Sequence, residues 1–222
     1  QSDLRLEATQ DADLNGLPMA AFFLRLNGEA VTTQQGAQLQ SGRDLSITAR
    51  DTTLNGTQAA KGALDVTAQR LSHGGKSDAA ATRVNAEERL ANSGTLLGDA
   101  LTLRGKQITN SGLLQGDRAL SLFADRLDNL NGGTLYSAAS LSLDLPALTN
   151  QGLITTDGDL TLRGGHITNG GLLQSQHALE VAAGQLDNLS GGTLYGADGL
   201  RLTISTLSNQ GLITTNGDLT LH

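Results

Sequence analysis

The chain repeats itself with a period of 59 residues, and this periodicity constrains its fold more than any other feature. Residues 101–159 and 160–218 are identical at 37 of 59 positions, and both begin with Leu-Thr-Leu-Arg-Gly. A third copy begins at Leu219 and stops at His222. Repeats of this kind build stacked units that bury their apolar faces against their neighbours. We therefore expect a repeat protein, and a piece of a longer array.

Each 59-residue copy consists of three shorter units of 19, 19 and 21 residues. Every unit carries an asparagine followed closely by glycine and by leucine or isoleucine, and these asparagines are Asn92, Asn110, Asn129, Asn150, Asn169, Asn188 and Asn209. The two additional residues of the longest unit enter in the same place, within residues 129–133 and 188–192. An insertion confined to one place predicts a loop on one edge of a stack.

Apolar and polar residues alternate in short stretches within each unit. Leu101 and Leu103 flank Thr102, and Ile108 and Leu114 also lie in alternating stretches. Alternation with a period of two is typical of strands with one buried face, and stacked strands about 4.8 Å apart would satisfy each other's backbone groups. No helical stripe of apolar residues runs through the repeats. The sequence therefore predicts an all-β parallel β-helix, a solenoid with coils of about 19–21 residues.

The repeated asparagines have a structural use in such a fold. An asparagine at the same corner of every coil can bond to those above and below it, as in the asparagine ladders of stacked strands, and can also satisfy turn backbone. A ligand-binding role is the alternative. We interpret the seven asparagines as a structural ladder.

Composition limits the possible functions. The chain has no cysteine, which excludes disulfides, thiolate metal sites and thiol nucleophiles, and its net charge of −7 argues against nucleic acid or anionic lipid as the main partner. Aromatic residues make up 2% of the chain, which suits a narrow aliphatic lumen. No apolar run is long enough for a membrane span, and the first residues do not form a signal peptide. If the protein is secreted, we expect its targeting region to lie upstream of Gln1.

The repeat fades towards the start of the chain, although its phase survives. The apolar-polar-apolar strand motif that begins at Leu101 is expected to begin also at Leu24, Leu45, Leu64 and Thr82. His73 takes the ladder position that asparagine fills elsewhere. A metal-binding role for this histidine is the minor alternative, because no acidic or histidine cluster accompanies it. We expect one continuous solenoid, with degenerate coils over residues 1–90 and regular coils over residues 91–222.

Two segments depart from the pattern. Residues 17–24 hold two of the three phenylalanines and the sole methionine, and residues 76–89 are rich in alanine and acidic residues. The second segment is expected to be a long loop or a short helix with Ser77 as its N-cap. If the chain carries a binding site, these segments are better candidates for it than the uniform coils.

The sequence contains no recognisable catalytic constellation. Asp128 and Asp187 are equivalent across the repeat and therefore stand three coils apart, too far to act as a carboxylate pair. None of the histidines has metal-ligand spacing, and a nucleophile elbow is absent. We expect no enzyme, cofactor, metal or small-molecule substrate. A row of leucines should point outward, where it could contact a partner or be covered by flanking side chains: Leu113, Leu153, Leu172 and Leu212.

The chain resembles the filamentous haemagglutinin repeats of two-partner-secreted exoproteins. The resemblance is carried by Leu-Asp-Asn-Leu-Ser-Gly-Gly-Thr-Leu at 186–194, Ile-Thr-Asn-Gly-Gly-Leu-Leu-Gln-Ser at 167–175 and the related run at 207–221. That family includes adhesins and the effectors of contact-dependent growth inhibition. The resemblance implies a right-handed β-helix within a long shaft, which a Gram-negative bacterium exports through an outer-membrane transporter and presents at its surface.

Three functions follow from this resemblance and from the fold. The first is a non-catalytic shaft segment, which the uniform coils favour. The second is a segment of such an effector that contacts a receptor on a target cell, and the remote third is a β-helix enzyme that acts on polysaccharides.

Overall fold

The computed structural model describes residues 4–7, 11–14, 19–20 and 23–222, with side chains described from Phe23 onward. The described residues form strands and turns and contain no helix, so none of them forms an apolar helix able to span a membrane. The strands are β1 (Leu4–Glu7), β2 (Asp11–Leu14), β3 (Met19–Ala20), β4 (Phe23–Thr33), β5 (Gln38–Ser41), β6 (Asp44–Leu54), β7 (Thr57–His73), β8 (Lys76–Asn92), β9 (Thr95–Arg104), β10 (Gln107–Asn110), β11 (Leu113–Phe123), β12 (Arg126–Asn129), β13 (Thr134–Ser137), β14 (Leu141–Asn150), β15 (Leu153–Thr156), β16 (Leu160–Asn169), β17 (Leu172–Ser175), β18 (Ala178–Asn188), β19 (Thr193–Gly196), β20 (Gly199–Asn209), β21 (Leu212–Thr215) and β22 (Asp218–Leu221).

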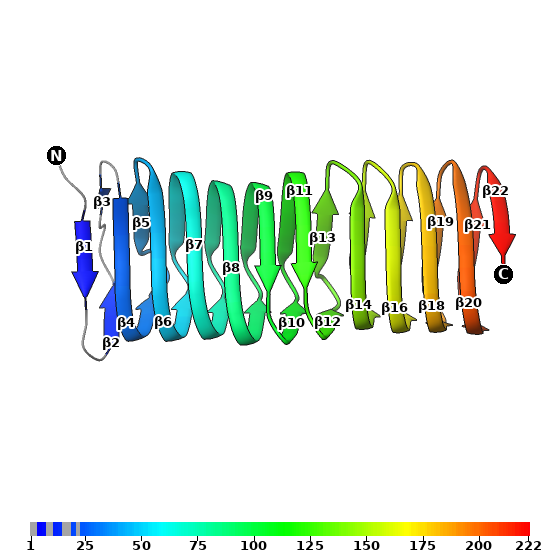
Figure 1. Ribbon diagram of the computed structural model, residues 1–222, viewed down its shortest axis with the longest axis horizontal. Coiled ribbons are helices and arrows are strands. Elements are labelled where there is room, and N and C mark those ends of the chain that lie inside the picture. Colours follow the sequence, from blue (N-terminus) through cyan, green and yellow to red (C-terminus); the bar gives the residue numbers. More distant parts are fainter. Residues whose placement is uncertain (1–3, 8–10, 15–18, 21–22) are drawn as a thin grey trace.

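The strands wind into an elongated stack in which each coil pairs in parallel with the next (Figure 1). The residues predicted to begin equivalent strand motifs are Cα partners from one coil to the next: Leu24 with Leu45, Leu45 with Leu64, Leu64 with Thr82, and Thr82 with Leu101. This register confirms the all-β parallel β-helix, and it confirms that the coils before residue 90 keep the phase of the regular repeats. The long strands β4, β6, β7 and β8 bend around corners instead of ending there.

Aliphatic side chains fill the narrow interior. Leu103 and Leu122 are Cα partners, as are Leu143 and Leu162, and all four are 4% exposed or less. Burying each leucine side chain contributes about 2 kcal/mol relative to leaving it in water. Because the next coil covers each coil, the core is a continuous column along the molecule.

The helix or long loop predicted for residues 76–89 is wrong. These residues belong to strand β8, which pairs with β7 on one side and with β9 on the other. Ser77 is fully buried inside the coil and is not an N-cap. Alanine and glutamate favour helix in isolation, but two neighbouring strands offer hydrogen-bond partners that override this weak preference. Of the other irregular segment, residues 17–18 and 21–22 lie outside the described residues.

The two-residue insertions form turns at one corner, as predicted. Within the first insertion, Gly132 has a φ of 82°, and Gly191 of the second has a φ of 87°. Only glycine adopts this left-handed conformation without strain. The Leu130 N–H donates to the Asn110 carbonyl at 2.7 Å, so the enlarged turn still bonds to the preceding coil.

One face of the stack has an interruption, which we call the open junction. Residues Ala119–Phe123 of β11 and Leu141–Leu145 of β14 occupy consecutive coils, but the described strands show no backbone pairing between these two segments. Figure 1 shows a wider space between β11 and β14 than between the other neighbours on this face. The other two faces of the same coils remain paired through β10 with β12 and β11 with β13.

Candidate functional site

The seven repeated asparagines form one line of side-chain hydrogen bonds along a corner of the stack. Each Nδ2–H donates to Oδ1 of the asparagine in the next coil, beginning with Asn92 to Asn110 at 2.7 Å and ending with Asn188 to Asn209 at 2.8 Å. The four intervening contacts, between Asn110, Asn129, Asn150, Asn169 and Asn188, measure 2.8–2.9 Å. All donors point the same way, towards the C-terminus.

Six of the seven asparagines, from Asn92 to Asn188, also satisfy backbone carbonyls in two coils. The Asn129 Nδ2 lies 3.2 Å from the Gly133 carbonyl in its own turn and 3.2 Å from the Leu153 carbonyl in the next coil. The side chain is fully buried, so water does not compete for these groups. A buried carbonyl that loses its partner costs roughly 1–3 kcal/mol, and the side-chain amide therefore holds consecutive corners together.

His73 begins the line at its N-terminal end. Its Nδ1 lies 2.8 Å from Asn92 Oδ1, and its Nε2 lies 2.9 Å from Ser77 Oγ. Because Asn92 uses its Nδ2 to donate to Asn110, its Oδ1 is the acceptor that faces His73. The imidazole must therefore carry a proton on Nδ1.

Burial keeps this imidazole neutral. His73 is fully buried, and removal from water lowers its pKa below the ordinary value of 6.5, while the hydrogen bond with Asn92 partly opposes that effect. Both ring nitrogens have polar partners, and no group of three His, Asp or Glu side chains among the described residues is arranged to hold a metal ion. A metal-binding role for His73 has no geometric support.

The histidine connects to further buried polar side chains in the N-terminal coils. Ser77 Oγ lies 2.8 Å from Gln58 Oε1, and the Gln58 amide lies 3.3 Å from Thr33 Oγ1. Gln58 and Ser77 occupy the column that Leu96 and Leu114 fill in later coils. The line of asparagines therefore continues into a mixed polar cluster inside an otherwise aliphatic interior.

A second polar column caps another corner, and the sequence interpretation missed it. Ser137, Thr156 and Ser175 are stacked and fully buried. Ser175 Oγ donates to the Gly158 carbonyl at 2.7 Å and accepts the His177 N–H at 3.0 Å, so one hydroxyl joins two coils. The available signal was a serine or threonine two residues after the inward aliphatic residue, recurring at the same period.

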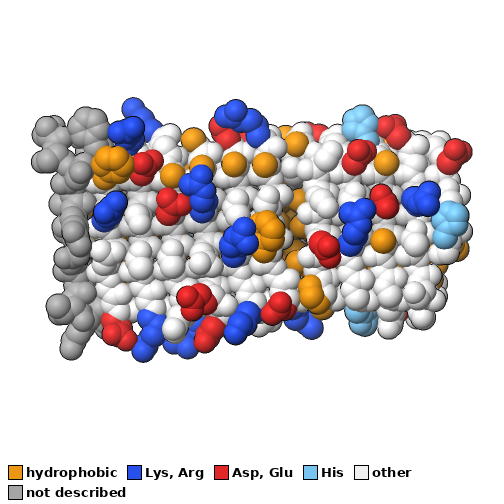
Figure 2. Space-filling model, in the orientation of Figure 1, with side chains coloured by type: hydrophobic (Ala, Val, Ile, Leu, Met, Phe, Trp, Pro, Cys, Tyr) orange, Lys and Arg blue, Asp and Glu red, His pale blue; other side chains and the backbone are white. Residues whose placement is uncertain are grey.

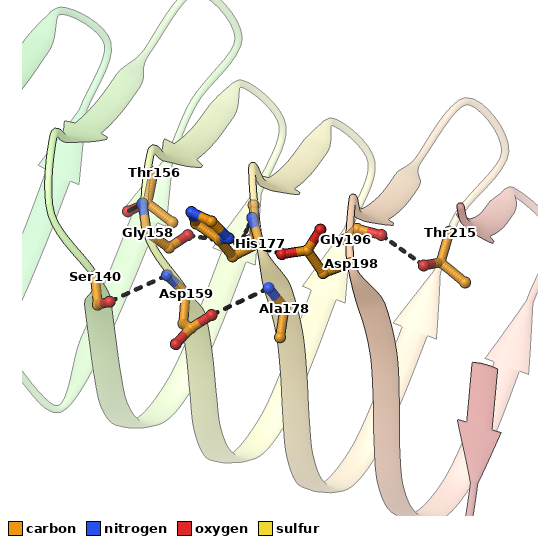
Figure 3. A network of polar contacts seen from close by, with 10 residues as sticks. Ser140, Thr156, Gly158, Asp159, His177, Ala178, Gly196, Asp198 and Thr215 are labelled. Carbon is orange, nitrogen blue, oxygen red and sulfur yellow. Dashed lines mark hydrogen bonds and ion pairs between the residues drawn. The ribbon is translucent and has the colours of Figure 1, made fainter. Parts of the chain in front are cut away.

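Exposed side chains continue these contacts on the surface of the same corner. Ser140 Oγ accepts the Asp159 N–H, and Asp159 Oδ1 accepts the Ala178 N–H, both at 3.1 Å (Figure 3). His177 Nδ1 lies 2.7 Å from Asp198 Oδ2. Each contact links one coil to the next. Asp159 therefore caps backbone of the next coil, whereas Asp198 contacts a side chain.

Asp128 and Asp187 occupy the same column but do not meet. Two intervening coils, which place Thr149 and Thr168 in this column, separate them. Burial raises the pKa of Asp128, but hydrogen bonds from Arg126 and Gln107 outweigh burial and hold that pKa below its ordinary value of 3.8. The equivalent Asp187 lies 2.8 Å from His166 Nε2. Isolated carboxylates of this kind do not form the pair that glycoside hydrolysis requires.

The row of outward leucines is partly covered. Leu113, Leu153 and Leu172 are half-buried, and Leu212 in the last coil is 54% exposed. Leu130 and Leu189 of the inserted turns are 37% and 42% exposed. Isolated exposed leucines are common on protein surfaces and do not by themselves identify a partner.

Comparison with known proteins places these features in a family. The family model described as haemagglutinin repeat matches residues 2–94, 97–164, 140–172 and 166–222. The chain is 41% identical over 212 residues to toxin CdiA of Escherichia coli, and equally similar to a tRNA nuclease CdiA of Escherichia coli strain 536, with 94% of this chain covered in both alignments. It is 37% identical over 228 residues to a 16S rRNA endonuclease CdiA of Enterobacter cloacae, with 77% of this chain covered.

The matched region is a small part of these relatives. The chain spans 7% of the length of toxin CdiA, 6% of the tRNA nuclease and 7% of the 16S rRNA endonuclease. No solved structure matches the chain.

Proposed function

This chain belongs to the haemagglutinin repeat family, and from that membership we propose that it is a non-catalytic segment of the shaft of a large exoprotein. Proteins of this kind are secreted by Gram-negative bacteria or presented at their surface. The observation that carries the proposal is the continuous stack of parallel coils, whose polar side chains bond from one coil to the next. A rod of this construction holds other regions of the parent protein at a distance.

The names of the relatives support a non-catalytic role for the shared region. One relative is named a tRNA nuclease, another a 16S rRNA endonuclease and a third a deoxyribonuclease. All three contain a region similar to this chain, although their named substrates differ. A region common to proteins with different substrates is better suited to carrying a toxic domain than to selecting its substrate.

We further propose that an outer-membrane transporter of the two-partner type exports the parent protein. The solenoid suits such export because each coil folds on the one before it and contacts only its neighbours. Folding can therefore proceed coil by coil as the chain emerges. Within this chain we propose residues 1–90 as the degenerate part and residues 91–222 as the regular part of the shaft.

Deleting residues 160–218 from the full-length parent protein tests the shaft function. This deletion joins Asp159 to Leu219 and reproduces the natural Asp-Leu junction, so it removes whole coils without changing the phase. We expect export and activity against target cells to persist with a change of only a few-fold. Loss of activity in a protein that still reaches the cell surface would contradict a spacer function.

A deletion that breaks the phase is the matched control. Removing residues 160–208 joins Asp159 to Asn209 and places a ladder asparagine where an inward leucine belongs. We expect this variant to misfold at the junction and to be exported poorly. The comparison separates the loss of length from the loss of structure.

A receptor-contacting function remains the second proposal, supported by the outward charged residues of β8. Asp78, Arg83, Glu87 and Glu88 are exposed on this strand, which departs from the regular repeats. Replacing these four residues by serine should abolish target-cell binding if they contact a receptor. Unchanged binding by the folded variant would remove this proposal.

The remote enzymatic alternative predicts depolymerisation of acidic polysaccharides, and we expect none.

A further inference from the structure

The open junction distinguishes two parts of the chain that are otherwise near copies. Adding 59 residues to each of its segments gives residues 178–182 and 200–204, which are joined by the same spacing along the chain. In the second copy, Leu179 pairs with Leu200 and the ladder continues through Ala182 and Thr203. In the first copy the equivalent segments do not pair with each other, although each pairs with the coil on its other side. The second copy is therefore a control for the first within one molecule.

The junction is too narrow to hold another strand but too wide for a regular ladder. Cα atoms of β11 and β14 still approach within 8 Å of each other, whereas an inserted strand requires about 9.6 Å, twice the normal spacing of roughly 4.8 Å. Figure 2 shows apolar side chains in a hollow across the middle of the shaft on this face. Leu120 and Leu122 of β11 are 5% and 4% exposed, whereas their counterparts Leu179 and Val181 are fully buried.

Two residues at the junction differ in ways that weaken pairing. Pro146 follows the segment of β14 that faces the junction and has no N–H to donate to the preceding coil, whereas its counterpart is Ser205. Phe123 replaces the small Ala182, is 47% exposed, and lies with its ring centroid 3.9 Å from Arg104 Cζ. The cation and the ring hold each other on the outer surface beside the gap.

The opposite corner of the same coils is fully bonded. Asn110 Nδ2 donates to Asn129 Oδ1 at 2.9 Å, and this corner lies between the two faces that remain paired. Separation of the coils on the third face therefore leaves the ladder of asparagines intact. The geometry is that of a hinge, with the ladder as its axis and the open junction as its free edge.

We propose that the open junction is a flexible joint in the shaft. At this joint the coils before Phe123 and those after Leu141 tilt relative to each other by opening the third face, while the asparagine ladder keeps them connected. This inference goes beyond the proposed function, because a spacer needs no joint. It concerns only the motion of the folded chain and stands whether or not the shaft also binds a receptor.

Hydrogen exchange measured on this folded chain tests the joint. Those amides of residues 119–123 and 141–145 that face the junction should exchange at least about tenfold faster than their counterparts within residues 178–182 and 200–204, because they lack the partner strand that those counterparts have. The paired strands β10 and β12 should stay as protected as the rest of the ladder corner. Equal exchange at the two sets of segments would overturn the proposal.

Engineered cysteines provide a second readout, since the chain has no natural cysteine. The pair S121C/S142C spans the joint, and E180C/R201C is its counterpart, whose Cα atoms are partners across a regular ladder. A disulfide requires Cα atoms about 4.4–6.8 Å apart. We expect the control pair to oxidise at least about fivefold faster than the pair across the joint, a difference that reflects the wider and fluctuating distance. Equal rates in folded variants would overturn the proposal.

Discussion

His73 lies directly below Asn92, with 2.8 Å between its Nδ1 and the Asn92 Oδ1, so a titratable ring occupies a position that amides fill in the regular coils. The only other titratable side chain that is buried among the described residues is Asp128, which lies in a later coil and on an outer face. A proton added to His73 would therefore place a charge in the interior without a counterion. This relationship predicts how the solenoid responds to acid.

The stability of the folded chain should fall as the pH drops below about 6.5. The folded-state pKa of His73 is lowered, so the unfolded chain takes up a proton first as the pH falls through its ordinary pKa. The stabilisation that depends on a neutral His73 is complete above pH 6.5 and is lost progressively as the pH falls towards the folded-state pKa. Urea midpoints measured at pH 8 and pH 5 should show the loss in the wild type.

The variant His73→Asn should lack this acid-sensitive component, because asparagine can donate to Asn92 Oδ1 without titrating near neutral pH. His177→Asn, at a position that is 59% exposed, is the matched control. A wild-type profile that His73→Asn does not change would contradict the assignment.

Replacing a ladder asparagine by its carboxylate analogue should destabilise the chain strongly. In Asn150→Asp the new oxygen would face Asn169 Oδ1 and the Leu172 carbonyl, both of which now accept from Asn150 Nδ2 at 2.9 and 3.1 Å. Loss of these bonds and burial of a charge should cost at least about 3 kcal/mol in unfolding free energy. Denaturation in urea checks the magnitude, and Asn131→Asp, in an exposed turn, should change it by less than about 0.5 kcal/mol.

Close contact between successive turns should make one class of glycine irreplaceable. A Cβ added at Gly171 would lie 2.1 Å from the Gly152 carbonyl oxygen, which neither backbone can relieve without moving the coils apart. Gly171→Ala should therefore cost about 2–3 kcal/mol. At Gly199 the nearest atom to an added Cβ is 3.5 Å away, so Gly199→Ala should be nearly neutral. Similar thermal midpoints for the two variants would show that the coils can separate freely.

The Asp128 carboxylate should contribute to the free energy of unfolding in an acid-sensitive way, by less than the ladder asparagines do. Its lowered pKa means that its stabilisation is present above pH 3.8 and is lost as the pH falls below that value through the folded-state pKa. Asp128→Asn should cost about 1 kcal/mol at pH 7, because Arg126 is 54% exposed and water screens the ion pair. Asp144→Asn, at an exposed position, is the control. An equal effect of both substitutions on the urea midpoint would argue against a specific role for the carboxylate.

Periodicity alone was sufficient to predict the architecture. The spacing of Leu24, Leu45 and Leu64 placed degenerate coils in the correct register because an inward position shifted by one residue would turn each strand inside out. Composition misled for residues 76–89, where local helix preference lost to strand pairing on both sides. The register of the neighbours, and not the residues themselves, determines the structure there.

Other features of the polar corners could not be read from spacing. Ser137 and Thr156 belong to a column that glycine interrupts at Gly116 and Gly196, so no single residue type marks it. The two segments of the open junction are separated by the same number of residues along the chain as their paired counterparts. The two sites differ only in their side chains, including the proline at position 146. Such differences depend on three-dimensional contacts between coils.

The shared direction of the asparagine donors has a consequence for how such shafts change length. Asn209 presents its amide in the same orientation as Asn150, one 59-residue block earlier. A gene duplication that inserts a complete block therefore creates no new kind of interface: the added coils meet a donor at one end and an acceptor at the other. Selection can lengthen or shorten the rod by recombination between near-identical blocks, and each product folds with contacts that already exist.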